Sequence, residues 1–307
     1  MACPSAASEA ELTTEESVNP MRRSITIGID PSSEAIEAAR VGASFARRLD
    51  RNLVLARVVA EPPAPPYGNR LTSAVLRRRA IQSATDLLKS VATEIGEEGA
   101  RKRVSLFGPA EESPEDGLAR LLREEDSDLL VVGADARGEL PHALAGSRSA
   151  SLLRSCPCPL MVVPAGSTNP FAARRLAAPG PIVCGIDWSV SSDRARLVAE
   201  GVSGRLGLPV LPIYVDQIGP WKENLGGVQV EVGDPATALV RAAARHRASL
   251  IVVGMSAHET LSSSVGRGLA ATAPVPVLIV SPGSRLPHFR TAADIELVRT
   301  AELVQAA

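Results

Sequence analysis

Short apolar runs alternate along this chain with longer segments in which apolar residues recur at helical spacing. Between residues 22 and 165 the runs ITIGI, LVLARVV, VSLF, LLVVG and LMVV predict strands, and the segments near 33–49, 73–95, 114–124 and 147–155 predict helices. Runs that are apolar throughout and are separated by helices are typical of a parallel sheet covered on both faces. The pattern therefore predicts an α/β fold.

The pattern occurs twice. Three segments return in the same order: ITIGIDPS at 25–32 as IVCGIDWS at 182–189, LLVVGA at 129–134 as LIVVGM at 250–255, and CPCPLMVVP at 156–164 as APVPVLIVSP at 273–282. Self-similarity at such a long period indicates two copies of one folded unit. We expect two tandem Rossmann-like domains, each with a doubly wound parallel sheet of five strands.

The matched positions also give the domain boundaries and show that the second copy is shorter. The offset between the copies falls from 157 residues at Asp30 and Asp187 to 117 at Pro157 and Pro274. Most of the loss lies between LPIYV and VQVEV, so one covering helix is expected to be missing there. We predict a disordered leader at 1–21, a first domain at 22–165, a linker at 166–180, a second domain at 181–283 and a tail at 284–307 that includes a short amphipathic helix.

Composition excludes several classes of protein. The 33 basic and 34 acidic residues nearly cancel, so no overall field favours nucleic acid or an anionic membrane surface. No apolar run is long enough to span a bilayer, and the polar, acidic N-terminus does not resemble a signal peptide. We therefore expect a cytoplasmic protein. The four cysteines form neither a disulfide framework nor a metal site, and we interpret them as structural thiols.

Two loops in the first domain are candidates for a ligand site, because doubly wound sheets bind ligands at the carboxyl ends of their strands. Asp30 follows the first predicted strand, and Gly133 begins a loop that runs into a helix near Ser147. A glycine-flanked loop that leads into a helix N-terminus is suited to an anion. The alternative is that Gly133 merely ends a strand and Ser147 merely caps a helix, and the loop by itself leaves both interpretations open.

The loop and the strand after it resemble the nucleotide-binding motif of the universal stress protein family. Gly133 is followed by Ala136, then by nine residues, then by Gly146-Ser147, and SCPCPLMVV follows where the last strand of such a domain belongs. The resemblance covers nearly all of residues 22–164. It implies ATP, with Mg²⁺, as the ligand of the first domain. The implied contacts are Asp30 and the backbone near Val58 for adenine and ribose, and Gly133, Ala136, Arg137, Gly146, Ser147 and Ser149 for the phosphates.

Two positions of the first domain depart from the family motif. Ala136 replaces the second glycine, and if that position requires a positive φ, the methyl group costs roughly 1 kcal/mol. Asp135 places a carboxylate in the phosphate loop, where it repels a triphosphate unless Mg²⁺ lies between them or Arg137 offsets its charge.

The second domain departs further from the motif. Its loop is four residues shorter after Gly254, and His258 and Glu259 stand where the first domain has Arg137 and its neighbour. We expect this domain to bind no nucleotide. Trp188, next to Asp187, either fills an adenine-sized space or caps the core, and the sequence leaves both interpretations open.

The resemblance implies an ATP-binding stress-response and signalling protein rather than an enzyme, with the second domain as a degenerate partner. It also implies that the strands LMVV at 160–163 and VLIV at 277–280 pair to form an intrachain pseudo-dimer. The sequence leaves open whether further chains associate into a homo-oligomer. The alternatives are an interaction module of the same fold that binds no nucleotide, and slow ATP hydrolysis with a metal held by Asp135.

Overall fold

The computed structural model describes residues 23–63, 70–107, 113–135, 156–172, 179–217, 226–255 and 264–287. The expected leader at 1–21 and the expected tail helix lie outside these residues. The first half contains β1 (Ser24–Gly28), α1 (Ser33–Leu49), β2 (Asn52–Ala60), α2 (Arg70–Glu94), β3 (Arg101–Phe107), α3 (Pro114–Glu124), β4 (Ser127–Ala134) and β5 (Leu160–Pro164). The second half contains β6 (Ile182–Ile186), α5 (Val190–Leu206), β7 (Val210–Asp216), β8 (Gln229–Val232), α6 (Pro235–Arg245), β9 (Leu250–Gly254), α7 (Ser264–Thr272) and β10 (Val277–Val280).

The strands form a single ten-stranded sheet in the order β3-β2-β1-β4-β5-β10-β9-β6-β7-β8. Within each half all neighbouring strands are parallel, and the two halves have the same strand order. The prediction of two doubly wound parallel sheets is confirmed. Between the halves, β5 and β10 pair in antiparallel orientation, with Val162 opposite Val277 and Leu160 opposite Ile279. This pairing joins the two five-stranded sheets edge to edge.

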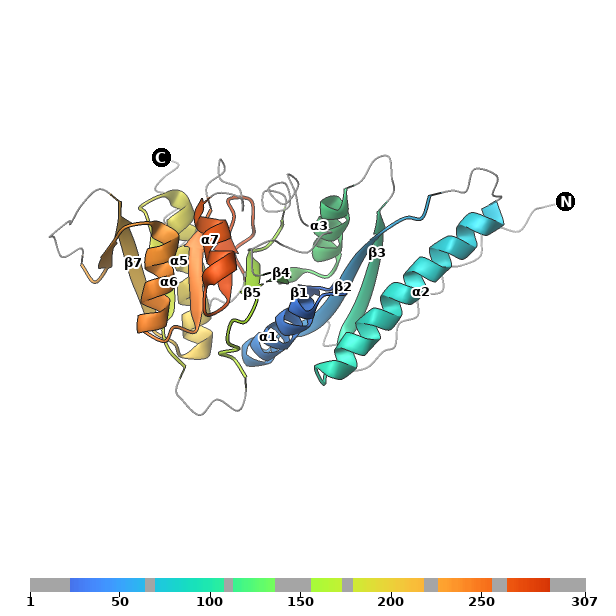
Figure 1. The fold of residues 1–307 in the computed structure, drawn as a ribbon, viewed down its shortest axis with the longest axis horizontal. Helices are drawn as coiled ribbons and strands as arrows, with labels where there is room; N and C mark the ends of the chain where they lie inside the picture. Colours follow the sequence, from blue (N-terminus) through green and yellow to red (C-terminus); the bar gives the residue numbers. More distant parts are fainter. Residues whose placement is uncertain are drawn as a thin grey trace.

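Helices cover both faces of the sheet (Figure 1). The apolar core is continuous from one half to the other. On one face, side chains of α1, α2 and α5 pack in one cluster, which includes Phe45, Leu88 and Val198. On the other face, α3, α6 and α7 supply a second cluster. Each cluster contains residues of both halves, so the two halves bury their apolar surfaces in shared clusters on each face of the sheet.

Side-chain caps fix where the helices begin. Ser113 and Asp116 form a capping box at the start of α3, and Pro114 occupies its first turn. Asp234 caps α6 by accepting from the Thr237 N–H at 2.9 Å, and a proline follows it. These caps satisfy N–H groups that have no partner inside the helix. They also place the helix N-termini close to the carboxyl ends of the preceding strands.

The second half is shorter between β7 and β8, the position at which the sequence predicts a missing helix. In the first half, the 25-residue α2 connects β2 to β3. In the second half, β7 ends at Asp216 and β8 begins at Gln229, and the described part of that connection contains no helix. Over the described residues, α5 therefore covers its face of the second half without a counterpart of α2.

The beginning of the predicted linker packs against the first half. Phe171 is 3% exposed, and its ring centroid lies 4.7 Å from that of Phe45 on α1. Asn169 donates to the carbonyl of Arg40 at 3.3 Å and to the hydroxyl of Ser44 at 3.2 Å. The sequence did not predict this contact, because a single buried aromatic side chain among turn-forming residues produces no periodic pattern.

Candidate ligand sites at the carboxyl ends of the strands

Three of the predicted site residues lie together at one edge of the first half. Asp30 follows β1, Val58 lies near the end of β2, and Gly133 lies near the end of β4. β1 pairs with β2 on one side and with β4 on the other, so the strand order reverses between β1 and β4, where doubly wound folds hold their ligands. The remaining five predicted residues lie outside the described part of the chain: Ala136, Arg137, Gly146, Ser147 and Ser149.

Asp30 shapes the turn that leads from β1 into α1. Its Oδ1 accepts from the backbone N–H of Ser32 at 3.0 Å and also from the Ser32 hydroxyl. The Ser32 hydroxyl oxygen in turn accepts from the Ala35 N–H at 3.1 Å and caps α1. A carboxylate offers about four acceptor sites, so Asp30 retains capacity for a ligand hydroxyl.

Gly133 is required by packing. A Cβ atom at this position would lie 2.5 Å from the carbonyl oxygen of Glu34, in the first turn of α1. The equivalent Gly254 is required for the same reason, since a Cβ atom there would lie 2.2 Å from the carbonyl oxygen of Ser191 in α5. Both glycines allow a helix backbone to approach the end of a strand. This close approach explains the first glycine of the motif in both halves, including the half whose loop departs most from it.

The side-chain hydrogen bonds of the turn at Asp187 repeat those at Asp30, although Trp188 has a positive φ and its equivalent Pro31 does not. Asp187 Oδ1 accepts from the Ser189 N–H at 2.9 Å, and the Ser189 hydroxyl oxygen accepts from the Ser192 N–H at 3.2 Å. Partial burial acts to raise the pKa of the Asp187 carboxyl, but hydrogen bonds from Ser189 and Ser192 outweigh it and lower that pKa below its ordinary value. Asp187 is therefore a carboxylate at neutral pH.

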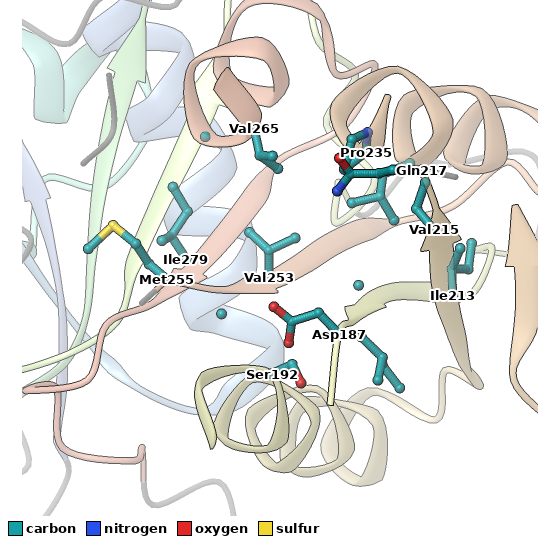
Figure 2. A pocket seen from close by; sticks show the side chains of 15 residues that line it. Asp187, Ser192, Ile213, Val215, Gln217, Pro235, Val253, Met255, Val265 and Ile279 are labelled. Carbon is teal, nitrogen blue, oxygen red and sulfur yellow. The ribbon is translucent and has the colours of Figure 1, made fainter. Parts of the chain in front are cut away.

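A cavity of about 180 Å³ lies beside Asp187, where the strand order of the second half reverses (Figure 2). The carboxyl ends of β6, β7 and β9 and the first turns of α5, α6 and α7 line it. Its apolar walls come from Ile186, Ile213, Val215, Pro235, Leu239, Val253, Met255, Val265 and Ile279. The polar side chains in the described lining are Asp187, Ser192 and Gln217. Figure 2 shows the Asp187 carboxylate directed toward Val253.

Both interpretations of Trp188 are wrong. Its side chain is 58% exposed, so it does not cap the core, and it is absent from the described lining of the cavity, so it does not fill that space. Its backbone is left-handed, with φ of 64°, and its ring lies 6.4 Å from that of Tyr214. A positive φ is uncommon for a bulky residue, and no pattern in the sequence indicates it for this tryptophan.

The sequence analysis did not predict the cavity, because it assessed ligand binding in the second half only from the shortened loop after Gly254. That loop, at 256–263, lies outside the described residues. The described lining of the cavity consists of strand-end and helix-start residues, among them Gly185, Asp187 and Gly254. The repeat of GID before both turns was the available signal.

The described cysteines are buried and unbridged. Cys156, Cys158 and Cys184 are each at most 2% exposed. Burial raises the pKa of the Cys184 thiol to about 12 and that of Cys158 well above its ordinary value. Over the described residues, no group of three or more histidine, cysteine or acidic side chains is placed to hold a metal ion. None of the described helices is both long and apolar enough to cross a bilayer.

Comparison with known proteins agrees with this architecture. The family model described as "Universal stress protein family" matches residues 21–164 and 222–281. A universal stress protein of Mycolicibacterium smegmatis is 29% identical over 300 residues, which covers 84% of this chain and 97% of the relative. Universal stress protein Rv2005c of Mycobacterium tuberculosis is 26% identical over 299 residues, covering 83% and 96%. The crystal structure of a universal stress protein from Archaeoglobus fulgidus shares the fold, with a TM-score of 0.61 at 16% identity, over 86% of this chain and all of that one.

Proposed function

Because this chain belongs to the universal stress protein family, we propose that it is a regulatory protein that binds ATP at the carboxyl edge of its first half. Binding, rather than turnover, is the proposed activity, and the cytoplasm is the proposed location. The observation that carries the proposal is the convergence of Asp30, Val58 and Gly133 where the strand order reverses, next to the loop that contains the family motif.

The described residues suit the sugar side of a nucleotide. The Asp30 carboxylate is held in place by Ser32 and retains acceptor sites for ribose hydroxyl groups. Val58 is partly buried near the end of β2, and its backbone is proposed to face the base, as the family resemblance implies. In this proposal the phosphates lie on Ala136, Arg137, Gly146, Ser147 and Ser149, with Mg²⁺ offsetting the charge of Asp135.

The second half is proposed to act as the fixed partner of the first, in an intrachain pseudo-dimer. The β5–β10 pairing and the shared core clusters support this role, because packed side chains of both halves form the continuous network that coupling between the halves requires. Stress-dependent signalling would then follow from the ATP-bound fraction of the chain.

Calorimetric titration of the full chain with Mg-ATP tests the proposal. We expect one site per chain, abolished or strongly weakened in Asp30→Asn and retained in the matched variant Asp187→Asn. Loss of binding in Asp187→Asn with retention in Asp30→Asn would place the nucleotide in the second half and contradict the proposal. Absence of heat at millimolar ATP would leave an interaction module of this fold as the function.

A further inference from the structure

The first half of α2 projects away from the rest of the protein. Figure 1 shows α2 running beside β3 at its C-terminal end and diverging from β3 toward its N-terminal end. The burial of its side chains follows the same course, because buried residues begin only at Ala84 and continue with Leu88, Val91 and Ala92. All described side chains of the helix before Ala84 are exposed or half-buried. Residues 71–83 are therefore called the projecting half of α2.

Apolar side chains of the projecting half face solvent. Leu71 is 74% exposed, Val75 is 51% exposed and Ile81 is 38% exposed. The described part of the chain exposes six large apolar side chains, and these are three of them. Leu71, Val75 and Arg78 follow one another at spacings of four and three residues, which places them on one side of the helix. Exposed apolar side chains that are grouped rather than scattered mark an interaction surface.

The projecting half is also basic. Arg77, Arg78 and Arg79 follow one another, and residues 71–83 contain no acidic side chain. Arg77 lies 3.9 Å from the Glu61 carboxylate. Arg78 and Arg79 are exposed, and within the described part of the chain neither makes an ion pair or a hydrogen bond. The surface therefore offers two guanidinium groups beside exposed apolar side chains, which suits an acidic segment with apolar residues of its own.

Charge complementarity identifies the occupant of this surface. We propose that the projecting half of α2 is the docking site for residues 1–21 of the same chain. This segment contains no lysine or arginine, and it carries four acidic and two larger aliphatic side chains: Glu9, Glu11, Glu15, Glu16, Leu12 and Val18. A segment of this composition cannot bury enough apolar surface to fold by itself, but it can become ordered on a complementary surface. Docking here does not depend on nucleotide binding by the first half.

The acidic segment is long enough to reach the surface. Along the axis of α2, Arg78 lies about 24 Å from Glu94, because an α-helix rises ~1.5 Å per residue. Glu94 lies at the edge of the sheet where β1 begins, because α2 leads from the end of β2 to the start of the parallel strand β3. An extended chain spans up to ~3.3 Å per residue, so Glu11 can lie as far as about 40 Å from Arg23. The glutamates can therefore contact Arg78 and Arg79.

Two other occupants fit the surface less well. A second copy of α2 would bring the arginines of two chains together, and like charges repel. An anionic lipid surface attracts the same arginines but repels residues 1–21 of the same chain. The acidic segment complements both the charge and the apolar side chains of the surface, and its attachment keeps it at a high effective concentration.

Hydrogen exchange in the full chain tests the docking. A truncated variant that lacks residues 2–21 keeps every described residue and removes the acidic segment. We expect the amide hydrogens of residues 71–83 to exchange at least about threefold more slowly in the full chain than in this variant, because docking stabilises the exposed helical turns. The amide hydrogens of α5 provide the control and should exchange equally in both proteins. Equal exchange of the projecting half in the two proteins would overturn the proposal.

Binding of the separate segment identifies the contacts. A peptide of residues 1–21 with a fluorophore on Cys3 is titrated with the truncated variant and followed by fluorescence anisotropy. We expect the full chain to bind this peptide at least about tenfold more weakly, because its own segment occupies the surface at roughly millimolar effective concentration. In the truncated variant, Arg78→Gln combined with Arg79→Gln should lower the affinity about three- to tenfold. Lys89→Gln removes an exposed charge from the other half of α2 and should leave the affinity unchanged.

Three outcomes of these titrations would overturn the proposal. The first is a peptide that does not bind the truncated variant, or that binds equally well after both arginines are replaced. The second is self-association of the truncated variant that the same replacements abolish, which would make a second copy the occupant. The third is co-sedimentation of the full chain with vesicles of phosphatidylcholine and phosphatidylserine, lost with the same replacements, which would make an anionic lipid surface the occupant.

Discussion

Met161 of β5 lies directly opposite Leu278 of β10, and the two residues occupy the same position in the two copies of the repeat. They are separated by the 117-residue offset that relates Pro157 to Pro274. A residue that pairs with its own equivalent marks the position of a pseudo-two-fold axis, as in a symmetric homodimer. The pairing of β5 with β10 is therefore symmetric about this local axis.

Backbone hydrogen bonds on each side of this axis obey the same symmetry. The Thr168 N–H donates to the Pro274 carbonyl at 3.0 Å, and the Arg285 N–H donates to the Pro157 carbonyl at 2.8 Å. After its last strand, each half thus crosses to the segment that precedes the last strand of the other half. The crossing reinforces the strand pairing at both of its ends.

The junction is expected to contribute strongly to stability. Met161 and Leu278 are fully buried, so Met161→Ala and Leu278→Ala should each lower the free energy of unfolding by about 2–5 kcal/mol. Because the two residues are neighbours, the double variant should depart from additivity by about 0.5–3 kcal/mol. Urea denaturation of the four proteins of this cycle measures both quantities, and strict additivity would contradict a direct contact.

Gly133 and Gly254 are expected to tolerate no side chain. Gly133→Ala and Gly254→Ala place a methyl group against a helix backbone, and each should lower stability by about 1–3 kcal/mol. Gly204→Ala is the matched control, because Gly204 lies in α5 and a Cβ atom there would meet no neighbouring atom within 4 Å, so this change should raise stability by about 0.5–1 kcal/mol. Thermal unfolding of the three variants distinguishes the two destabilising changes from the stabilising control. A Gly133→Ala variant with unchanged stability would show that α1 can move away from the end of β4.

Glu231 is expected to make stability depend on pH in the acid range. Burial acts to raise the pKa of its carboxyl, but hydrogen bonds from Arg245, at 2.6 Å, and Gln229, at 2.7 Å, lower that pKa below its ordinary value of 4.5. A carboxyl whose pKa is lower in the folded state stabilises the fold above its unfolded pKa and loses this contribution as the pH falls through its folded pKa. The stability difference between the natural chain and Glu231→Gln should therefore be largest at neutral pH and shrink below pH 4.5.

Glu200 provides the control for this measurement. Its ion pair with Arg196 is about half exposed, so Glu200→Gln should change stability little at any pH. Denaturant titrations at neutral and acid pH measure the free energy of unfolding of both variants. If the destabilisation by Glu231→Gln does not shrink at acid pH, the lowered pKa of Glu231 is not its cause.

The buried thiols are expected to be unreactive in the folded chain. Burial raises the pKa of Cys184 to about 12 and that of Cys158 well above its ordinary value, so almost no thiolate of either is present at neutral pH. A hydrogen bond with Cys158 lowers the pKa of Cys156, but that thiol is 2% exposed and a reagent cannot reach it in the folded chain. In a Cys3→Ser background, a thiol reagent such as dithionitrobenzoate should label these cysteines only after urea is added. Labelling before unfolding would show that this part of the core opens.

The sequence alone determined the parts of this protein that depend on local pattern. Apolar runs and helix caps identified the strands and helices, and the repeated GID and VVG segments identified two similar halves, because periodicity and capping act over a few neighbouring residues. The alternation of strands and helices predicted a parallel sheet in each half, but the order of the strands came from the structure. The sequence also named Asp30 and Gly133, but it did not show that Gly133 is required by contact with Glu34.

The tertiary structure decided what depends on surfaces that meet from distant parts of the chain. The register of β5 against β10 around Met161 and Leu278, the packing of Phe171 on Phe45, and the cavity beside Asp187 each require residues far apart in sequence. Trp188 shows the limit most plainly, because neither its exposure nor its left-handed backbone is predicted by residue type. Burial and non-local packing determine these features, and composition and periodicity carry no information about them.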